Sequence, residues 1–227
     1  MELIRKVALG VVLVATAGCG SPVSDLAQAV WGARGGEEEA EPAPALRPDR
    51  AAIEAADLAA IVIAGEQYGV TAIAGAIQLR EDRVIFNSSE NRSVMLDGGL
   101  IYTTRGFGEN LQAVETAADD PLVTKASPAD WPDELTRTYL FSGYGPQFAP
   151  LIATCRISVG SDVAQIDVVE ATRNAVTITE RCTAENGSAF TNQHFVDPAD
   201  GEVWRTLQWT GPKQGFILVD VIEPFTG

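Results

Sequence analysis

From Ile53 onwards, apolar and polar residues alternate in short runs, a pattern typical of half-buried β-strands. Gly, Asn, Asp or Pro residues separate most of these runs. The runs predicted as strands are 58–65, 68–79, 82–89, 92–99, 99–106, 134–143, 150–160, 161–171, 174–184, 187–197, 201–211 and 214–225. In the second half of the chain, the connections are short enough to join only antiparallel neighbours. We therefore predict an all-β fold, a large antiparallel meander that curls into a half-barrel or open barrel with one or two short helices.

Two segments interrupt the strand pattern. Leu111 and Val114 are spaced as on a helix, and Pro121 follows them, which predicts one short helix within 108–121. Residues 119–133 contain three prolines and are predicted to be a long surface connection. Near the C-terminus, GFILVDVI at 215–222 is apolar on both faces, which predicts a central, covered strand. Residues 53–227 are predicted to form a single β domain.

The N-terminus has a charged start and then an apolar run from Val7 to Ala17. This run is shorter than the roughly 20 apolar residues needed to span a bilayer, and small residues follow it. We therefore predict a signal peptide at residues 1–18. The sequence Thr16-Ala17-Gly18-Cys19 resembles the lipobox of bacterial lipoproteins, although Leu is commoner than Thr at its first position. That resemblance implies that the sulfur of Cys19 carries diacylglycerol.

The alternative is an ordinary secretory signal that is cleaved after Ala17, with an incidental cysteine at position 19. If Cys19 becomes the first residue of the mature chain, Gly20 is the second. The sorting pattern of lipoproteins, in which Asp at that position acts as a retention signal, then implies the outer membrane. We expect a lipid-anchored protein of the bacterial outer membrane whose domain faces the periplasm.

Between the signal and the β domain, residues 19–52 are predicted to be a lipidated N-terminus and a flexible acidic tether. The stretch GGEEEAEPAPALRPDR is rich in Glu and Pro and nearly free of large apolar residues, so it cannot bury enough surface to offset its ordering entropy. The whole chain has a formal charge of −15, which argues against binding to nucleic acid or to an anionic lipid surface.

Besides Cys19, the chain has only Cys155 and Cys182, and an exported protein with two thiols tends to pair them. We predict a disulfide, with two buried free thiols as the alternative. The prediction meets a geometric objection, because the two cysteines are placed two predicted strands apart. In a flat sheet such strands lie about 9 to 10 Å from each other, beyond the reach of a disulfide. A metal site is not expected, since His194 is the only histidine and no cysteine lies at a zinc-ligand spacing from it. No cofactor is expected either.

Enzymatic chemistry has weak support. Asp167, Glu170, Glu180 and Glu202 could supply the acid and base of a sugar hydrolase, but the chain has 31 acidic residues, and some pair always looks plausible. His194 has no G-x-S-x-G partner for nucleophilic catalysis and is interpreted as a half-exposed strand residue. No catalytic residue is predicted.

Three other side chains are candidate contacts for a glycan or a partner protein. Arg105 lies in TRGFGEN, residues 104–110, which is interpreted as a turn into a short helix, or alternatively as an anion-binding loop. Trp204 and Trp209 are an odd number of residues apart, so a regular strand would place them on opposite faces. An exposed Trp is a surface on which sugars stack, while core packing is the commoner role.

The C-terminal region resembles the signature of the YjbF/GfcB family, lipoproteins of exopolysaccharide and group 4 capsule operons. The resemblance rests on Phe195-Val196-Asp197, Gly201, Arg205, Gln208 and the apolar run 216–222, with Phe195 where the family often has Trp. The segment GGLIYTTRGFGENL, residues 98–111, also resembles the family's strand, glycine turn and short helix, and Cys19 matches its lipidation site. The resemblance implies an all-β, curled-sheet lipoprotein with no catalytic residues.

We therefore expect a non-enzymatic accessory in capsule or exopolysaccharide production or export. Its expected partners are the membrane, through the N-terminal lipid, other envelope proteins of polysaccharide export, and the polysaccharide itself. Two alternatives stay open. One is a periplasmic carrier that binds acyl chains in the concavity of the sheet, and the other, with less support, is a glycan hydrolase.

Overall fold

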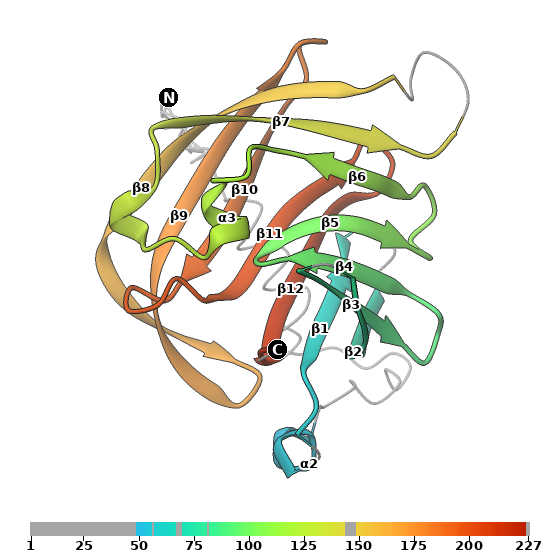
Figure 1. Ribbon diagram of the computed structural model, residues 1–227, viewed down its shortest axis with the longest axis vertical. Helices are drawn as coiled ribbons and strands as arrows, with labels where there is room; N and C mark the ends of the chain where they lie inside the picture. The colour runs from blue at the N-terminus through green and yellow to red at the C-terminus, as the bar shows by residue number, and fades with distance from the viewer. Residues whose placement is uncertain (1–48, 56, 67–69, 81, 144–148, 226–227) are drawn as a thin grey trace, which may run out of the picture. The chain divides into compact units, whose positions relative to one another are not determined.

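The computed structural model describes residues 49–55, 57–66, 70–80, 82–143 and 149–225 (Figure 1). The predicted signal peptide, Cys19 and the predicted tether up to residue 48 lie outside these described residues. Twelve strands form one sheet: β1 Ala60–Gly65, β2 Val70–Arg80, β3 Arg83–Ser88, β4 Ser93–Asp97, β5 Leu100–Arg105, β6 Leu111–Glu115, β7 Glu134–Phe141, β8 Leu151–Val168, β9 Ala171–Ala184, β10 Ala189–Val196, β11 Val203–Gly211 and β12 Gly215–Glu223.

All neighbouring strands in the sheet are antiparallel, and their order is β5-β4-β3-β2-β1-β12-β11-β10-β9-β8-β7-β6. The first and last strands of the chain therefore pair in the middle of the sheet, while β5 and β6 form its two edges. The sheet curls until these edges lie side by side (Figure 1). The Leu111 N–H of β6 donates to Thr104 Oγ1 of β5 across 3.0 Å. The predicted all-β curled sheet is confirmed.

The central pair β1 and β12 is covered on both faces. All six residues of β1 are buried, and Ile217 to Ile222 of β12 are buried without interruption. Their sequences, AIVIAG and ILVDVI, are apolar at both phases of the strand repeat, as a strand without a solvent face requires. The prediction of a central, covered strand near the C-terminus is confirmed.

The helix predicted within 108–121 is wrong, because Leu111–Glu115 is strand β6. A bulge explains the error. The register of β6 against β7 shifts between Leu111 and Ala113, which adds one residue to β6. Because of this extra residue, Leu111 and Val114 are both buried although they are an odd number of positions apart. The bulge thus produces the spacing that a helix would show.

The predicted strands 150–160 and 161–171 are one continuous strand, β8, of 18 residues. Gly160-Ser161, interpreted as a turn, belongs to a bulge in which the register against β9 shifts between Val159 and Val163. The turn comes later, at Val169 and Glu170, which both have positive φ. Two residues of this conformation form the tight connection that matches the twist of a hairpin.

Among the described residues, two short α-helices and one 3₁₀-helix accompany the sheet, and none of them replaces strand β6 as the predicted helix would. Helix α2, Arg50–Ala55, precedes β1, and its buried Arg50 donates from Nη1 to Val169 O (2.9 Å) and from Nη2 to Ile222 O (2.7 Å). Helix α3, Pro121–Thr124, and the 3₁₀-helix η2, Pro128–Asp130, lie in the segment predicted to be a surface connection. No helix among the described residues has the length and apolar composition needed to cross a membrane.

Gly201 provides a test of how tightly the β10–β11 connection packs on the loop after α3. It has φ +75°, and a Cβ on it would lie 1.9 Å from Lys125 O, whereas Gly187, with φ +86°, has open space around it. We expect Gly201→Ala to lower the free energy of unfolding, measured in urea, by about 3 kcal/mol or more, because the backbone at Lys125 would have to move to make room for the added Cβ. Gly187→Ala, the matched control, should cost only about 1 kcal/mol. Equal losses would mean that the loop yields easily.

Candidate functional site

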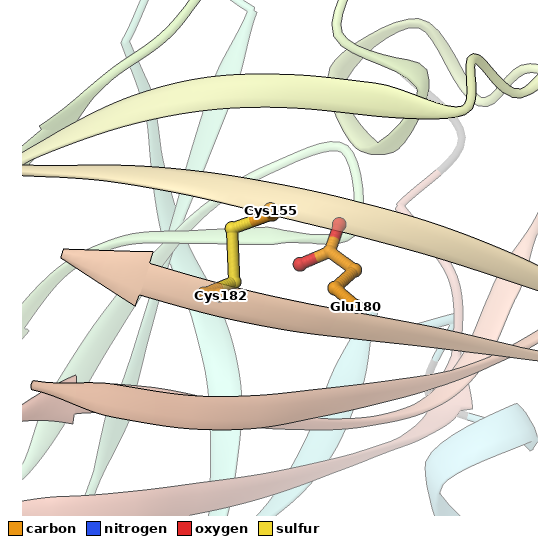
Figure 2. A group of neighbouring side chains, drawn as sticks. All are labelled: Cys155, Glu180 and Cys182. Atoms are coloured by element: carbon orange, nitrogen blue, oxygen red, sulfur yellow. A yellow bond between two sulfur atoms is a disulfide. The ribbon is translucent and has the colours of Figure 1, made fainter.

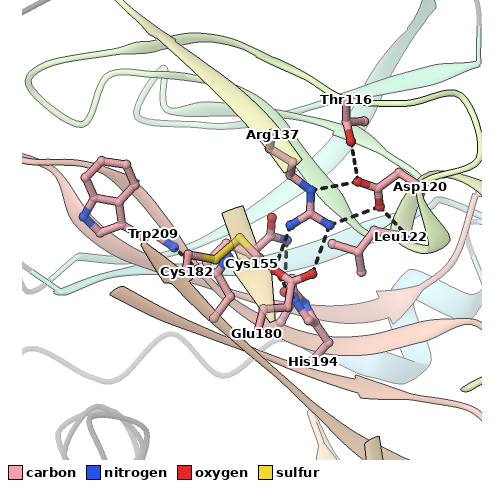
Figure 3. A network of polar contacts seen from close by, with 12 residues as sticks. Thr116, Asp120, Leu122, Arg137, Cys155, Glu180, Cys182, His194 and Trp209 are labelled. Carbon is pink, nitrogen blue, oxygen red and sulfur yellow. Dashed lines mark hydrogen bonds and ion pairs between the residues drawn. A yellow bond between two sulfur atoms is a disulfide. The ribbon is translucent and has the colours of Figure 1, made fainter. Parts of the chain in front are cut away.

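The sheet encloses a buried arginine that binds two carboxylates. Arg137, on β7, has no exposed surface. Its guanidinium donates from Nε and Nη2 to Asp120 at 2.8 and 3.0 Å, and from Nη1 and Nη2 to Glu180 at 2.7 and 3.0 Å (Figure 3). Both contacts are bidentate, the geometry in which a guanidinium binds a carboxylate most strongly. Arg137 thereby joins β7 to β9 and to the segment before α3.

Asp120 is fixed by its own neighbours. It is the N-cap of α3, and its Oδ1 accepts the Leu122 N–H at 3.0 Å. Its Oδ2 accepts the hydroxyl of Thr116 at 2.6 Å. A helix N-terminus offers unpaired N–H groups and favours a negative charge. The local contacts of Asp120 therefore hold its carboxylate in place in addition to the contact with Arg137.

On the other side, polar contacts continue from Glu180 across the sheet. Asn192 Nδ2 donates to Glu180 Oε2 at 3.0 Å, and His194 Nε2 lies 3.3 Å from the same oxygen without hydrogen-bond geometry. The other ring nitrogen of His194 is 2.7 Å from Thr206 Oγ1. These residues come from β10 and β11, so the network extends along three neighbouring strands.

The network ends on the edge strand β5. Gln208 Nε2 donates to Thr206 Oγ1 at 2.9 Å and to Gly99 O at 2.7 Å, and Gln208 Oε1 accepts the Ile101 N–H at 3.1 Å. An edge strand has backbone groups without a neighbouring strand. The Gln208 side chain therefore satisfies backbone groups of β5 from the inside of the curl.

The charges perturb one another strongly. Burial alone would raise the pKa of Glu180, but the charge of Arg137 and the hydrogen bonds from it, together with the nearby His194, outweigh burial and hold this pKa well below its usual range. Burial alone would lower the pKa of Arg137, but Glu180 and Asp120 raise it well above its ordinary value. Burial raises the pKa of Tyr139, two residues along β7, to about 12 against the opposing charge of Arg137. The arginine and Glu180 therefore stay ionised at neutral pH.

A disulfide between Cys155 and Cys182 lies beside Glu180 (Figure 2). The two cysteines are directly paired across β8 and β9, with their Cα atoms 3.9 Å apart. The geometric objection to this bond was wrong because β8 is one strand, so Cys155 and Cys182 lie on adjacent strands. The bond joins cysteines 27 positions apart, and closing a loop of that size stabilises the fold by about 3.5 kcal/mol in the chain-entropy account.

The two sulfurs and a Glu180 oxygen all lie within 4.8 Å of one another, a spacing compatible with a metal ion. The chemistry does not fit a metal, however. Zinc and similar ions bind thiolates, and these sulfurs are bonded to each other. The Glu180 carboxylate is turned towards Arg137 (Figure 3).

The three candidate contact residues lie in different places. Arg105 is exposed at the end of β5. Trp204 is 8% exposed, lies under the guanidinium of Arg173 at 4.0 Å, and donates from Nε1 to Asp197 Oδ2 at 3.1 Å. Trp209 is half-buried and stacks on Phe190, with ring centroids 4.4 Å apart. Neither indole is thus a fully exposed platform, and a glycan contact by these three side chains stays a prediction.

Trp209 belongs to the interior because the strand is irregular there. Regular pairing of β10 with β11 ends at Gln193 and Leu207, and the Trp209 N–H then donates to Asn192 Oδ1 at 2.9 Å. Its ring contacts Tyr139 and Phe141, which share the strand face of Arg137. The odd spacing from Trp204 therefore does not decide which face Trp209 occupies.

The carboxylates considered for hydrolysis are engaged separately. Asp167 accepts the hydroxyl of Thr172 at 3.0 Å, Glu170 is exposed in the β8–β9 turn, and Glu202 accepts from Lys125 Nζ at 2.6 Å. Glu180 is fully buried, and so is His194, which was wrongly interpreted as half-exposed. The Thr104–Asn110 stretch joins two strands and does not lead into a helix.

The sequence reasoning missed Arg137 and the central role of Glu180. A usable signal was present. In ELTRTYLF, Arg137 has the same strand phase as Tyr139 and Phe141, and Glu180 has the phase of Ile178 and Cys182. A charged residue at the apolar phase of a strand must find a partner inside the core. Two such residues of opposite charge are therefore predicted to form an ion pair inside the core.

This arrangement is suited to holding strands together. The side chains of Arg137, Glu180 and His194 have no exposed surface, and the charges of Arg137 and the two carboxylates face one another. A substrate would have to open the sheet to reach them. The network therefore holds neighbouring strands together across the enclosed face.

Arg137→Met tests how much the buried network contributes to stability. The change leaves Asp120 and Glu180 buried without their cation, so we expect it to lower the free energy of unfolding by about 3 to 5 kcal/mol. Arg156→Met is the matched control, because the Arg156 side chain is 85% exposed and lies 3.7 Å from Glu134. It should change stability by no more than about 0.5 kcal/mol. Urea unfolding measures both, and similar losses would contradict a central role for Arg137.

Acid should weaken the same buried network. The depressed pKa of Glu180 gives stability that is complete above its unfolded pKa and is lost as the pH falls, so the free energy of unfolding should drop from about pH 5 to pH 2. Glu180→Gln should flatten this slope. Asp220 contributes to the pH dependence with the opposite sign, because burial raises its pKa although its hydrogen bonds and ion pair with Arg205 lower it. Asp220→Asn should therefore make the fall in stability with acid steeper. Urea titrations at several pH values measure the slopes, and an unchanged slope in Glu180→Gln would contradict the assignment.

The comparisons with known proteins agree with this fold. The chain resembles the crystal structure of the hypothetical lipoprotein YmcC from Escherichia coli (K12) with a TM-score of 0.67, at 16% sequence identity. The match covers 83% of this chain and 100% of the other, and at that identity it shows a shared fold. No curated protein sequence matches the chain significantly.

Residues 23–222 match the family described as "Group 4 capsule polysaccharide lipoprotein gfcB, YjbF". The matched range includes every strand residue of the sheet except Glu223, the last residue of β12. It also includes the whole buried network and the disulfide. The chain is a member of the YjbF/GfcB family of capsule polysaccharide lipoproteins.

Proposed function

We propose that the chain is a lipid-anchored, non-enzymatic accessory in the production or export of capsule or exopolysaccharide, held at the outer membrane with its β domain in the periplasm. The observation that carries the proposal is the family match over residues 23–222. The family description supplies the lipoprotein character and the link to capsule polysaccharide. The sequence supports the anchor through Cys19 and the outer membrane through Gly20.

The geometry of the interior supports a non-enzymatic role. The strongest cluster of charged groups is sealed from solvent and satisfied internally. The exposed carboxylates considered for sugar hydrolysis bind other partners or lie in turns. An acid and base pair needs two carboxyl groups facing a substrate-sized space.

The same interior favours an accessory over a carrier of acyl chains. Large side chains such as Phe107, Ile101 and Leu122 fill it, and each is at most 2% exposed. The centre holds the buried Arg137 network, whose charged and hydrogen-bonded groups offer an acyl chain no apolar surface. An acyl carrier needs an apolar cavity at this position.

Deletion of the gene tests the function, and Cys19→Ala tests the anchor. Deletion should lower surface polysaccharide severalfold while its intracellular precursors stay unchanged, and the wild-type gene should restore it. Cys19→Ala should fail to restore it and should leave the membrane fraction, because the lipid acceptor is lost. Ser21→Ala is the control that should behave as wild type.

Quantification of cell-surface glycan and membrane fractionation with mass spectrometry of the mature N-terminus give the readouts. A deletion strain with unchanged surface polysaccharide would refute the accessory role. A mature N-terminus without an acylated Cys19 would refute the anchor.

A further inference from the structure

A groove follows the line where the two edges of the sheet meet, here called the seam groove. Its larger part has a volume of about 780 Å³ and lies between the β4–β5 turn, the end of β6 and α3. A smaller hollow of about 330 Å³ lies between Thr103–Arg105 of β5 and the start of β6 with the preceding Asn110. The larger volume falls within the range of roughly 300 to 1,000 Å³ that is typical of ligand sites.

The seam groove exists because β5 and β6 are the two ends of the strand order and do not pair with each other. Near their connection, the hydroxyl of Thr104 bridges them. At the other end, α3 packs against the start of β5, where Gly99 donates to Leu122 O at 2.9 Å. A Cβ on Gly98 would lie 2.2 Å from the same oxygen, so this approach requires glycine. The walls are therefore fixed at both ends while the seam between them stays open.

One wall presents an aromatic ring beside a cation. Tyr102 is an extra residue of β5, because the register against β4 passes from Met95 opposite Thr103 to Leu96 opposite Ile101. Bulges re-aim side chains and are common near binding sites. The guanidinium carbon of Arg83 lies 4.0 Å from the centre of the Tyr102 ring, and Arg83 Nε donates to Asp97 Oδ2 at 2.7 Å. The half-buried ring is thus held in place at the edge of the groove.

The opposite wall of the groove is connected to the buried network by hydrogen bonds. Glu115, at the end of β6, is exposed in the groove. Thr116 follows it, lines the groove, and donates its hydroxyl to Asp120, which binds Arg137. Lys125, after α3, also lines the groove and is held by Glu202 at 2.6 Å. A ligand would therefore meet a preformed surface, which reduces the entropy lost on binding.

The lining fits a ligand with many hydroxyl groups. Carboxylates accept hydrogen bonds from neighbouring hydroxyls, guanidinium and ammonium groups donate to them, and a tyrosine ring packs against the C–H face of a sugar. The apolar residues that line the larger part of the groove are small, so an acyl chain would find little to contact there. They are Gly98, Val114, Ala117, Ala118 and Val123.

The charges favour an uncharged ligand. The acidic side chains that line the groove are Asp82, Asp97 and Glu115, and the basic ones are Arg83 and Lys125 in its larger part and Arg105 in the smaller hollow, so the two signs balance. The whole chain carries a formal charge of −15. A polyanion would be repelled by this field.

We propose that the seam groove binds a segment of uncharged polysaccharide, with a sugar ring packed against the exposed part of Tyr102 and its hydroxyls bonded to Glu115 and to the polar groups around Arg83. The proposal rests on the proposed function, because the link to polysaccharide comes from the family. It adds the part of the surface that contacts the glycan.

Binding to oligosaccharides tests the groove directly. The protein is the full-length lipoprotein in detergent micelles, and the probes are oligosaccharides released from the source bacterium's own surface polysaccharide and separated into uncharged and acidic fractions. Calorimetry should show binding of an uncharged fraction. Tyr102→Ala should weaken it roughly tenfold, and Tyr102→Phe, which keeps the ring, should bind as wild type.

Glu115→Gln provides a second variant at an exposed position, so its fold is not at risk. It should weaken binding, whereas Glu185→Gln, an equally exposed change in the β9–β10 turn, should not. The groove assignment is overturned if wild type binds no fraction, or if Tyr102→Ala and Glu115→Gln both bind normally. Tighter binding of the acidic fraction overturns the choice of an uncharged ligand.

The same variants separate this proposal from the proposed function in cells. If the deletion lowers surface polysaccharide and folded Tyr102→Ala or Glu115→Gln restores it fully, the accessory role stands and the seam groove is not the site. If the deletion changes nothing, the accessory role itself fails. Restoration by Glu185→Gln and by Tyr102→Phe, but not by the groove variants, is the expected result.

Discussion

A single guanidinium group, that of Arg137, holds the enclosed face of the sheet together. It binds the carboxylate that caps α3 and the carboxylate at the centre of β9, and from Glu180 the contacts run through β10 and β11 to the backbone of β5. Burying these charges is favourable only because each one is paired and hydrogen-bonded. Through Asp120 and Thr116, the same pairing ties α3 and one wall of the seam groove to the buried centre.

Much of the fold could be predicted from the sequence, because strand alternation and short turns are local signals. The errors share one physical cause, which is that bulges break the alternation. At Leu111–Val114 the bulge imitates helical spacing, and at Gly160-Ser161 it imitates a turn. The pairing of β1 with β12 is also beyond local reasoning, since it joins residues more than 150 positions apart.

The site was harder to predict. The resemblance marked Asp197, Gly201, Arg205 and Gln208, and the structure gives all four roles in folding. Asp197 accepts a hydrogen bond from Trp204 Nε1 at 3.1 Å. Gly201 lets the β10–β11 turn approach the loop after α3, Arg205 binds Asp220 at 2.8 Å, and Gln208 satisfies the edge of β5. Arg137 and its partners come from distant segments and only the fold brings them together. Tyr102 owes its place in the groove to a bulge that no local pattern announces.

The central pairing of β1 with β12 also imposes an order on folding. The strand AIVIAG is the first of the sheet to be synthesised, and its partner is the last. Until β12 is complete, an apolar strand waits with one edge unpaired, which invites association with other chains. Closure must also await contacts of very long sequence separation, and such topologies fold slowly. Until the end of the chain is made, pairing between copies of the chain competes with the native pairing of β1 and β12.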